Sequence, residues 1–476
     1  MKRLLKVTAI MSSATVIILF FNLLKSKFIA VMLGPSGIGL YGLFISLYTT
    51  IVSLTTISTG GSIVKKVAEA SSEKDHKKLY FIQKVFSLIT IITGLLIGLI
   101  IFLTSDILSQ FAFGDLKYSL EIKLIGLVVV IAMFANFWQS WLNGLRLVEI
   151  IAKIRVYSTV ASTLISIILI YLFKIDGIIY SIIIIPIVTF FISGYFFITI
   201  CGVPKFFVSF KEYKHETIDI FKVGFVLLLI AMLFHVGVYV NRSIISNQLG
   251  IESVGIFFAA WTISMSYLEI FLSSLSVDYY PRLSENKGDI KNTIKIVNEQ
   301  LFFSLLISLP LIILIYIYAP LIITVLYSND FQDAVNILRW QIIGDIFKVF
   351  VWIFGFVLIA QNNLKFSLLI QIVWVGSYTL LLFFGLKDFG LEITGVAFLI
   401  SYFLTFIMSY LYVKIRYNFK FSRNNIQLFI IIIISLSSVM LPIENNIYFL
   451  VQNVILVMVV LYSILNMKGS YVRQAQ

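Results

Sequence analysis

Long apolar segments alternate with short polar connections along the whole chain of 476 residues. A helix needs about 20 predominantly apolar residues to cross the hydrocarbon core of a bilayer, and about fourteen segments reach this length. Their approximate limits are 8–33, 38–63, 80–104, 118–145, 154–173, 177–200, 219–245, 251–277, 296–327, 331–361, 365–386, 391–413, 425–441 and 446–466. The pattern predicts an all-α polytopic membrane protein.

The sequence also repeats itself. The stretch LGPSGIGLY at residues 33–41 matches LGIESVGIF at 249–257, and the same offset of 216 residues aligns KVAE at 66–69 with RLSE at 282–285. Because six predicted spans separate the copies, both copies have the same orientation, which predicts two six-helix bundles related by a parallel repeat. We expect an N-terminal half at 1–215, a C-terminal half at 216–415, and two additional helices with a cytoplasmic tail at 416–476.

The composition agrees with this pattern, since 60% of the residues are hydrophobic and 12% are charged, whereas soluble domains contain about 25% charged residues. The net charge of +13 comes largely from alternate connections, at 65–78, 146–155, 205–214, 282–291 and 414–423. By the positive-inside rule these connections face the cytoplasm, as do both termini. The charge is therefore a signal of topology, and a nucleic-acid partner is not expected.

Known catalytic motifs are missing from the sequence. The single cysteine, the three widely separated histidines, and the lack of HExxH, paired CxxC or phosphate-loop patterns argue against a metallohydrolase or an ATPase. No connection exceeds about 20 residues, so no soluble catalytic domain is expected. We predict that the protein is not an enzyme and uses no cofactor or metal.

One predicted span, 331–361, carries a polar stripe. Gln341, Asp345 and Lys348 follow at spacings of four and three, so they share one face of a helix. An ionisable side chain at mid-membrane costs roughly 2.5–3.5 kcal/mol, so this face must contact protein or water. Asp345 and Lys348 are close enough to pair. The pair is either a structural ion pair or a switch that opens when an anionic substrate competes for Lys348.

Four other predicted spans also carry polar residues. These residues are Asn22, Lys25 and Lys27; Asn136, Gln139, Asn143 and Arg146; His235, Tyr239 and Arg242; and Thr262, Ser266, Glu269, Ser273 and Ser276. Such residues either bond neighbouring helices or line a polar path. Because cations outnumber acids, the path would suit an anion such as a phosphate. Lys25 and Lys27 could instead extend to the outer interface. Glu269 and His235 are candidates for proton coupling. The tryptophans beside the polar residues are candidates for stacking on sugar rings, namely Trp138, Trp141, Trp261, Trp340 and Trp352.

Several of these residues lie in motifs that resemble a known family. The run RWQIIGDIFK at 339–348, followed by FG at 354–355 and IA at 359–360, resembles a helix of bacterial lipid-linked oligosaccharide flippases, including the Wzx-type O-antigen flippases. The stretch from Lys27 to Gly39, NGLR at 143–146, and SV with PRLS between 276 and 284 resemble other parts of that family. The similarity covers about residues 7–415.

The resemblance implies the multidrug/oligosaccharidyl-lipid/polysaccharide exporter fold and its polysaccharide transporter branch. It implies transfer of undecaprenyl-diphosphate-linked O-antigen repeat units from the cytoplasmic to the periplasmic leaflet of the bacterial inner membrane. It also implies functional roles for Lys27, Arg146, Asp345 and Lys348. Membrane lipid is a further partner, and an O-antigen polymerase and a chain-length regulator are candidate protein partners. Alternatives are a flippase for lipid II or another polysaccharide precursor, and a cation-drug antiporter of the same superfamily.

Overall fold

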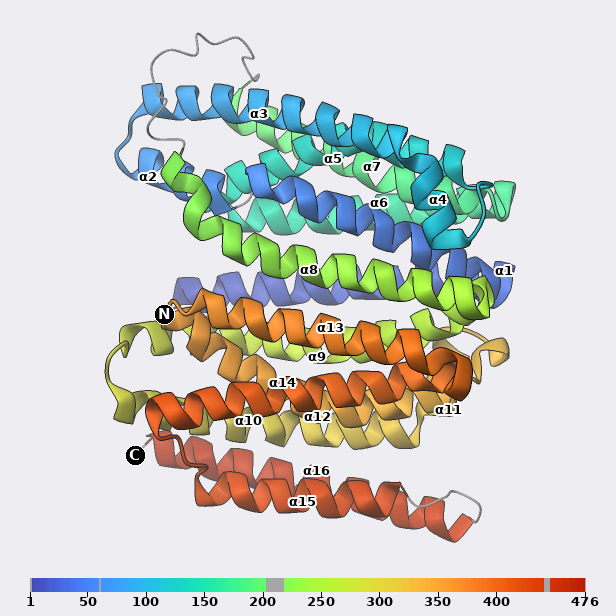
Figure 1. The fold of residues 1–476 in the computed structure, drawn as a ribbon. Coiled ribbons are helices and arrows are strands. Elements are labelled where there is room, and N and C mark those ends of the chain that lie inside the picture. Colours follow the sequence, from blue (N-terminus) through green and yellow to red (C-terminus); the bar gives the residue numbers. More distant parts are fainter. Residues whose placement is uncertain (1, 60, 203–217, 441–445, 476) are drawn as a thin grey trace. The chain divides into compact units, whose positions relative to one another are not determined.

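A computed structural model describes residues 2–59, 61–202, 218–440 and 446–475, and these residues form helices and no strands (Figure 1). The cations predicted at 205–214 and the domain boundary predicted at 215 lie outside the described residues. The helices are α1 (Lys2–Thr59), α2 (Gly61–Ser72), α3 (His76–Leu103), α4 (Ser105–Phe113), α5 (Ser119–Gly144), α6 (Val148–Phe173), α7 (Gly177–Cys201), α8 (Ile218–Leu249), α9 (Ile251–Glu285), α10 (Ile290–Ile317), α11 (Ala319–Leu326), α12 (Ala334–Ala360), α13 (Leu364–Phe389), α14 (Ile393–Tyr417), α15 (Arg423–Val439) and α16 (Asn446–Ala475).

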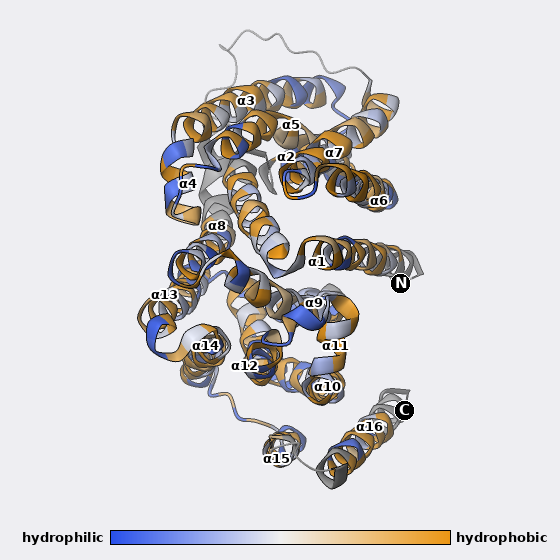
Figure 2. Cartoon of the chain, turned by 90° about the vertical axis from the view of Figure 1, so that its right-hand side faces the viewer, coloured by the Kyte–Doolittle hydropathy of each residue, from blue (hydrophilic) through white to orange (hydrophobic). Residues whose placement is uncertain are grey.

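The predicted spans correspond to these helices. Ten described segments are long and apolar enough to cross a membrane, and two shorter apolar segments follow at Arg423–Ser438 and Leu450–Asn466. The segments Ile10–Leu54 and Leu364–Tyr417 each contain two predicted spans. Figure 2 shows that the helices are largely apolar along their length, with the most hydrophilic residues at helix ends and turns. The expectation of an all-α polytopic membrane protein is confirmed.

Within the part of the chain that the structure describes, the short helices α4 and α11 were not expected from the sequence. Each directly follows a long helix, after Thr104 and Tyr318 respectively. Each is too short to cross a bilayer, since nine residues of helix extend only about 14 Å. Apolar residues continue through the break before α11, so hydropathy merged α11 with the preceding span, 296–327. By contrast, α4 fell in the connection that follows the predicted span 80–104.

The chain forms two compact units, Met1–Phe258 and Ala259–Gln476, and the division falls inside α9. The repeat is visible in the order and lengths of the helices. α3 and α10 both have 28 residues, α6 and α13 both have 26, and α7 and α14 both have 25, at offsets of 214 to 216 residues. Asp75 caps the start of α3 as Asp289 caps α10. The division of the halves at residue 215 stays a prediction.

Positive φ values recur with the same offset. The pairs are Gly34 and Gly250, Arg146 and Asn362, Lys174 and Gly390, Gly202 and Asn418, and, at an offset of 214, Lys74 and Gly288. Positive φ values are uncommon outside glycine, so five such pairs are a specific signature of common architecture. This pairing extends the sequence match from two short motifs to the turns between most of the repeated helices.

The first unit contains a break in α1 at Gly34, which has φ 65° and is followed by Pro35. The break separates the first two predicted spans. Beyond it, the two copies of the repeated motif touch through their backbones: a Cβ on Gly39 would lie 1.9 Å from the Ile251 carbonyl oxygen, and one on Gly255 would lie 1.9 Å from that of Pro35. This reciprocal contact requires glycine at both positions.

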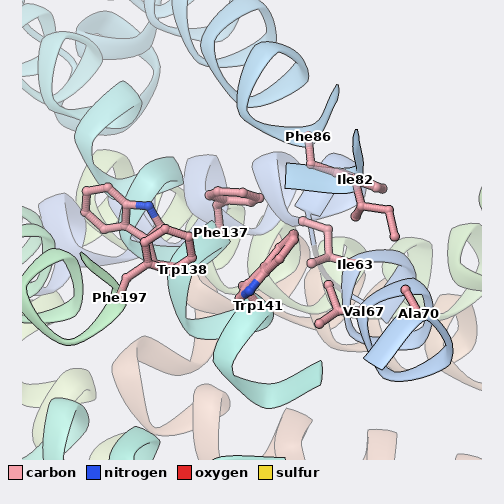
Figure 3. Close-up of a cluster of buried hydrophobic side chains, with 9 residues drawn as sticks. All are labelled: Ile63, Val67, Ala70, Ile82, Phe86, Phe137, Trp138, Trp141 and Phe197. Atoms are coloured by element: carbon pink, nitrogen blue, oxygen red, sulfur yellow. The ribbon is translucent and has the colours of Figure 1, made fainter. Parts of the chain in front are cut away.

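An aromatic and aliphatic cluster fills the space between α2, α3, α5 and α7 in the same unit (Figure 3). Trp138 stacks on Phe197, with ring centroids 5.7 Å apart, and Trp141 lies beside Phe137 at 6.1 Å. Both tryptophans are buried. Their rings are thus occupied by protein contacts, which does not favour the hypothesis that they stack on sugars.

In the second unit, α15 and α16 are attached to α10 by polar contacts near opposite ends of that helix. The Asn298 side chain accepts a hydrogen bond from the Ser422 backbone N–H at 2.8 Å and from Asn425 Nδ2 at 2.9 Å. After the end of α10, the Tyr318 hydroxyl donates to Asn453 Oδ1 at 2.6 Å. Such bonds replace the hydrophobic driving force that helix association lacks in lipid.

Candidate functional site

The polar stripe on α12 is buried in the second unit. Gln341 and Asp345 are completely buried, and the Lys348 side chain is 15% exposed. Lys348 Nζ lies 3.4 Å from Asp345 Oδ1, so the predicted pair is present in the structure. A buried carboxylate of this kind is stable only when charge and hydrogen bonds compensate for lost hydration.

Two residues of α9 complete the surroundings of Asp345. Its Oδ2 atom accepts hydrogen bonds from the Tyr267 hydroxyl at 2.8 Å and the Ser264 hydroxyl at 3.1 Å. Lys348 Nζ donates to the Ser264 carbonyl oxygen at 3.3 Å and lies 3.3 Å from Met265 Sδ. We call Gln341, Asp345, Lys348, Ser264 and Tyr267 the Asp345 cluster.

Sequence reasoning missed Ser264 and Tyr267. The stripe chosen on this helix contains Thr262, Ser266 and Glu269, and it shares no residue with the face that contacts Asp345. Serine and tyrosine are common in membrane helices, so only their spacing of three residues, next to a known buried acid, could have singled them out.

Close packing of α12 against α14 fixes the position of this stripe. A Cβ on Gly344 would lie 2.7 Å from the Phe398 ring and 3.0 Å from the Leu399 Cα atom. The Phe398 ring in turn lies 5.9 Å from Lys348 Nζ, within the range of a cation–π interaction. The lysine is thus held by a carboxylate, a carbonyl oxygen and an aromatic face.

The Asp345 cluster belongs to one copy of the repeat only. At the offset of 216 residues, Gln341, Asp345 and Lys348 correspond to Ile125, Val129 and Ala132 on α5. The architecture therefore accepts apolar residues at these positions. The acid and the base are not required by the fold itself.

Two other predicted residues, Lys25 and Arg242, come together in the first unit. Lys25 is buried with Nζ 5.1 Å from the Tyr41 ring centre, and Arg242 is buried with its guanidinium 4.8 Å from the Phe258 ring centre. Arg242 also donates to the Gly42 carbonyl oxygen at 2.8 Å. The two rings touch, with centroids 5.9 Å apart. Both cations are therefore buried against one aromatic pair.

The remaining predicted residues are exposed or half-buried. Asn143 and Arg146 are exposed at the end of α5, Glu269 is exposed on α9, and Lys27 is half-buried. His235 is half-buried, and its carbonyl oxygen accepts a hydrogen bond from the Thr50 hydroxyl at 3.0 Å. Among the described residues, no group of three or more His, Cys, Asp or Glu side chains could hold a metal ion.

The motif PRLS contributes an ion pair at the end of α9, beyond the membrane-spanning segment. Arg282 Nη2 donates to Glu299 Oε2 at 2.6 Å and Nη1 to Asp278 Oδ2 at 3.5 Å. Burial by itself lowers the pKa of Arg282, but the two carboxylates outweigh it and raise that pKa above its ordinary value. Both partners are partly exposed, so the network contributes at most about 1 kcal/mol.

Solved structures share this architecture. An inward-facing multidrug transporter of the MATE family and the MOP superfamily has a TM-score of 0.72 at 16% identity, over 86% of this chain and 98% of that chain. The lipid II flippase MurJ in an inward closed conformation has a TM-score of 0.75 at 17% identity, over 97% and 99%. The fold is therefore that of the MOP superfamily of membrane transporters.

Sequence comparison places the chain within one branch. The model of the polysaccharide biosynthesis protein family matches residues 2–336, and the chain belongs to this family. The lipid III flippase of Escherichia coli K12 is 24% identical over 380 residues, covering 79% of this chain and 88% of the relative. A putative O-antigen transporter of Shigella flexneri is 23% identical over 399 residues, covering 81% and 92%. The resemblance drawn from the motifs is confirmed.

Proposed function

We propose that the protein is a flippase that moves undecaprenyl-diphosphate-linked O-antigen repeat units from the cytoplasmic to the periplasmic leaflet of the inner membrane. The observation that carries this proposal is the Asp345 cluster, a buried acid–base pair in a membrane helix that the repeated helix α5 does without. Ionisable residues within membrane-spanning helices are rare and typically mark transport paths. The named functions of the relatives supply the class of substrate.

The chemistry of the pair suits a diphosphate. Lys348 is only partly exposed and is held by Asp345 at 3.4 Å. A diphosphate oxygen, like a carboxylate oxygen, forms a charge-assisted hydrogen bond with an ammonium, and so can compete with Asp345 for Lys348. In this mechanism Lys348 leaves Asp345 for the substrate and returns after release. Lys25, Lys27, Asn143, Arg146, Arg242 and Gln341 are the further proposed contacts along the path.

Alternating access by movement of the two repeats is the proposed mechanism of transfer. Both termini are proposed to be cytoplasmic. Glu269 and His235 remain proposed carriers of a coupling proton.

A deletion of the gene tests the proposal directly. Surface O-polysaccharide should disappear, and single repeat units should accumulate on the lipid carrier inside the cell. Persistence of full-length chains in a strain without a paralogue would show that the flippase assignment is wrong. Lys348→Ala should reproduce the deletion at normal protein levels, whereas Lys365→Ala, at an exposed lysine of α13, should not.

A second candidate is a flippase for another polysaccharide precursor, because the lipid III flippase is as similar to this chain as the O-antigen transporter is. Complementation separates the two. Restored O-antigen in a strain lacking its O-antigen transporter supports the first, and restoration only of the lipid III product supports the second.

A further inference from the structure

Gln341 is a buried amide for which the structure gives no bonding role. Its side chain is completely buried, and neither Oε1 nor Nε2 has a hydrogen-bond partner among the described residues. A buried amide without partners is costly, so such groups in native proteins call for an explanation. The repeat supplies Ile125 at the equivalent position, and hence the fold accepts an apolar side chain there.

The neighbouring carboxylate is incompletely satisfied. Asp345 Oδ2 accepts two hydrogen bonds from α9, whereas Oδ1 accepts none from the described residues and lies 3.4 Å from Lys348 Nζ. If Lys348 moved away, Oδ1 would be a buried carboxylate oxygen with neither a hydrogen-bond donor nor a cation beside it. Breaking a buried ion pair in this way is strongly unfavourable unless another donor takes over.

Gln341 is placed to be that donor. It precedes Asp345 by four residues, so both side chains lie on the same face of α12, one turn apart. Its amide carries two N–H donors on a flexible side chain. We propose that Gln341 donates to Asp345 Oδ1 when Lys348 leaves to bind the substrate diphosphate, and so holds the acid while the pair is open. The role in transport rests on the proposed function, but the exchange of donors does not.

A double-mutant cycle on the purified full-length protein in detergent tests the exchange. The midpoint of thermal unfolding is measured for the wild type, Gln341→Leu, Lys348→Met and the double variant. Gln341→Leu alone should shift the midpoint little, because the amide has no partner while Lys348 is in place. Lys348→Met should fold with a lower midpoint. In the double variant, the midpoint should fall by more than the sum of the two single shifts, because Asp345 Oδ1 then has neither the lysine nor the glutamine as a donor.

A matched control is Gln83→Leu, at a buried glutamine of α3 whose Nε2 also has no partner. This change should combine additively with Lys348→Met. In an Asp345→Asn background, the coupling between Gln341 and Lys348 should disappear.

Additive shifts for Gln341→Leu and Lys348→Met would overturn the proposal. So would a Lys348→Met protein that fails to fold, because Gln341 would then have failed to replace the lysine. The measurement needs no substrate, so its outcome is independent of the flippase assignment. If the midpoint shifts are non-additive but Lys348→Met exports normally, the exchange of donors is supported. Its role in transport is then refuted.

Discussion

Arg146 offers a test in which stability and transport should change in opposite directions. It occupies the left-handed position after α5, with φ 59°. Its N–H donates to the Asn143 carbonyl oxygen at 2.8 Å, and the Leu147 N–H donates to that of Leu142 at 3.1 Å, which is the Schellman pattern of helix termination. At the equivalent position after α12, Asn362 has φ 60° and the same two bonds. The turn therefore favours asparagine or glycine, and arginine is an uncommon residue there.

The expected gain can be bounded. The left-handed conformation costs a residue with a Cβ atom about 1 kcal/mol. Glycine removes this cost but adds unfolded-chain entropy of up to about 1 kcal/mol. Arg146→Gly should therefore change the unfolding free energy by between zero and about +1 kcal/mol. Arg146→Asn should fall in the same range, because asparagine is enriched in this conformation.

Export should nonetheless fall in both variants if the guanidinium binds the substrate. Surface polysaccharide is measured by electrophoresis of cell extracts, and stability by the thermal midpoint of the purified protein. Lys174→Gly is the matched control, since Lys174 has φ 53° after α6 and its repeat partner is already Gly390. It should relieve the strain of a positive φ without loss of export. Normal export by Arg146→Gly would refute the substrate role, and a lower midpoint would show that the side chain is structural.

Three further predictions concern single contacts. Tyr267→Phe removes the 2.8 Å hydrogen bond to the buried carboxylate and should lower the unfolding free energy by about 1.5–3 kcal/mol, seen as a lower thermal midpoint. Gly39→Ala places a methyl group 1.9 Å from the Ile251 carbonyl oxygen and should destabilise the protein by about 1–3 kcal/mol, whereas Gly376→Ala, with open space around it, should not. Asn298→Ala removes the side-chain hydrogen bonds from Asn298 to Ser422 and Asn425, at the start of α15, and should increase cleavage by protease after α14 in mass spectra.

Much of the architecture follows from the sequence because the bilayer restricts what a chain can do. An apolar segment of sufficient length must be helical, since lipid offers no partners for backbone groups. Hydropathy therefore located the spans. Two short motifs at one offset indicated a repeat, and the turns at Arg146 and Asn362 follow the same offset. Hydropathy could not locate α11, because the break at Tyr318 leaves the composition apolar, and it could not locate α4, because nine residues are too few to register as a span.

Only the charged residues of the site could be predicted from the sequence. Asp345 and Lys348 were visible because ionisable residues are rare in such helices, and their contact follows from spacing within one helix. The partners on α9 were not visible, because a contact between helices depends on their rotation, which Gly344 and Phe398 set through packing. A tyrosine or serine becomes significant only when this rotation is known.

Comparison of the two copies of the repeat separates the residues that serve the fold from those that serve transport. Positions that are alike in both copies, such as Gly39 and Gly255 or the turns after α5 and α12, serve the shared architecture. A charged side chain that occurs in one copy only is not required by that architecture, because the other copy folds without it. Asp345 has Val129 as its counterpart, and Arg146 has Asn362. Exchanging each residue for its counterpart should therefore preserve the helix or turn while removing the chemistry, which makes Asp345→Val with Lys348→Ala a sharper probe of transport than either single change.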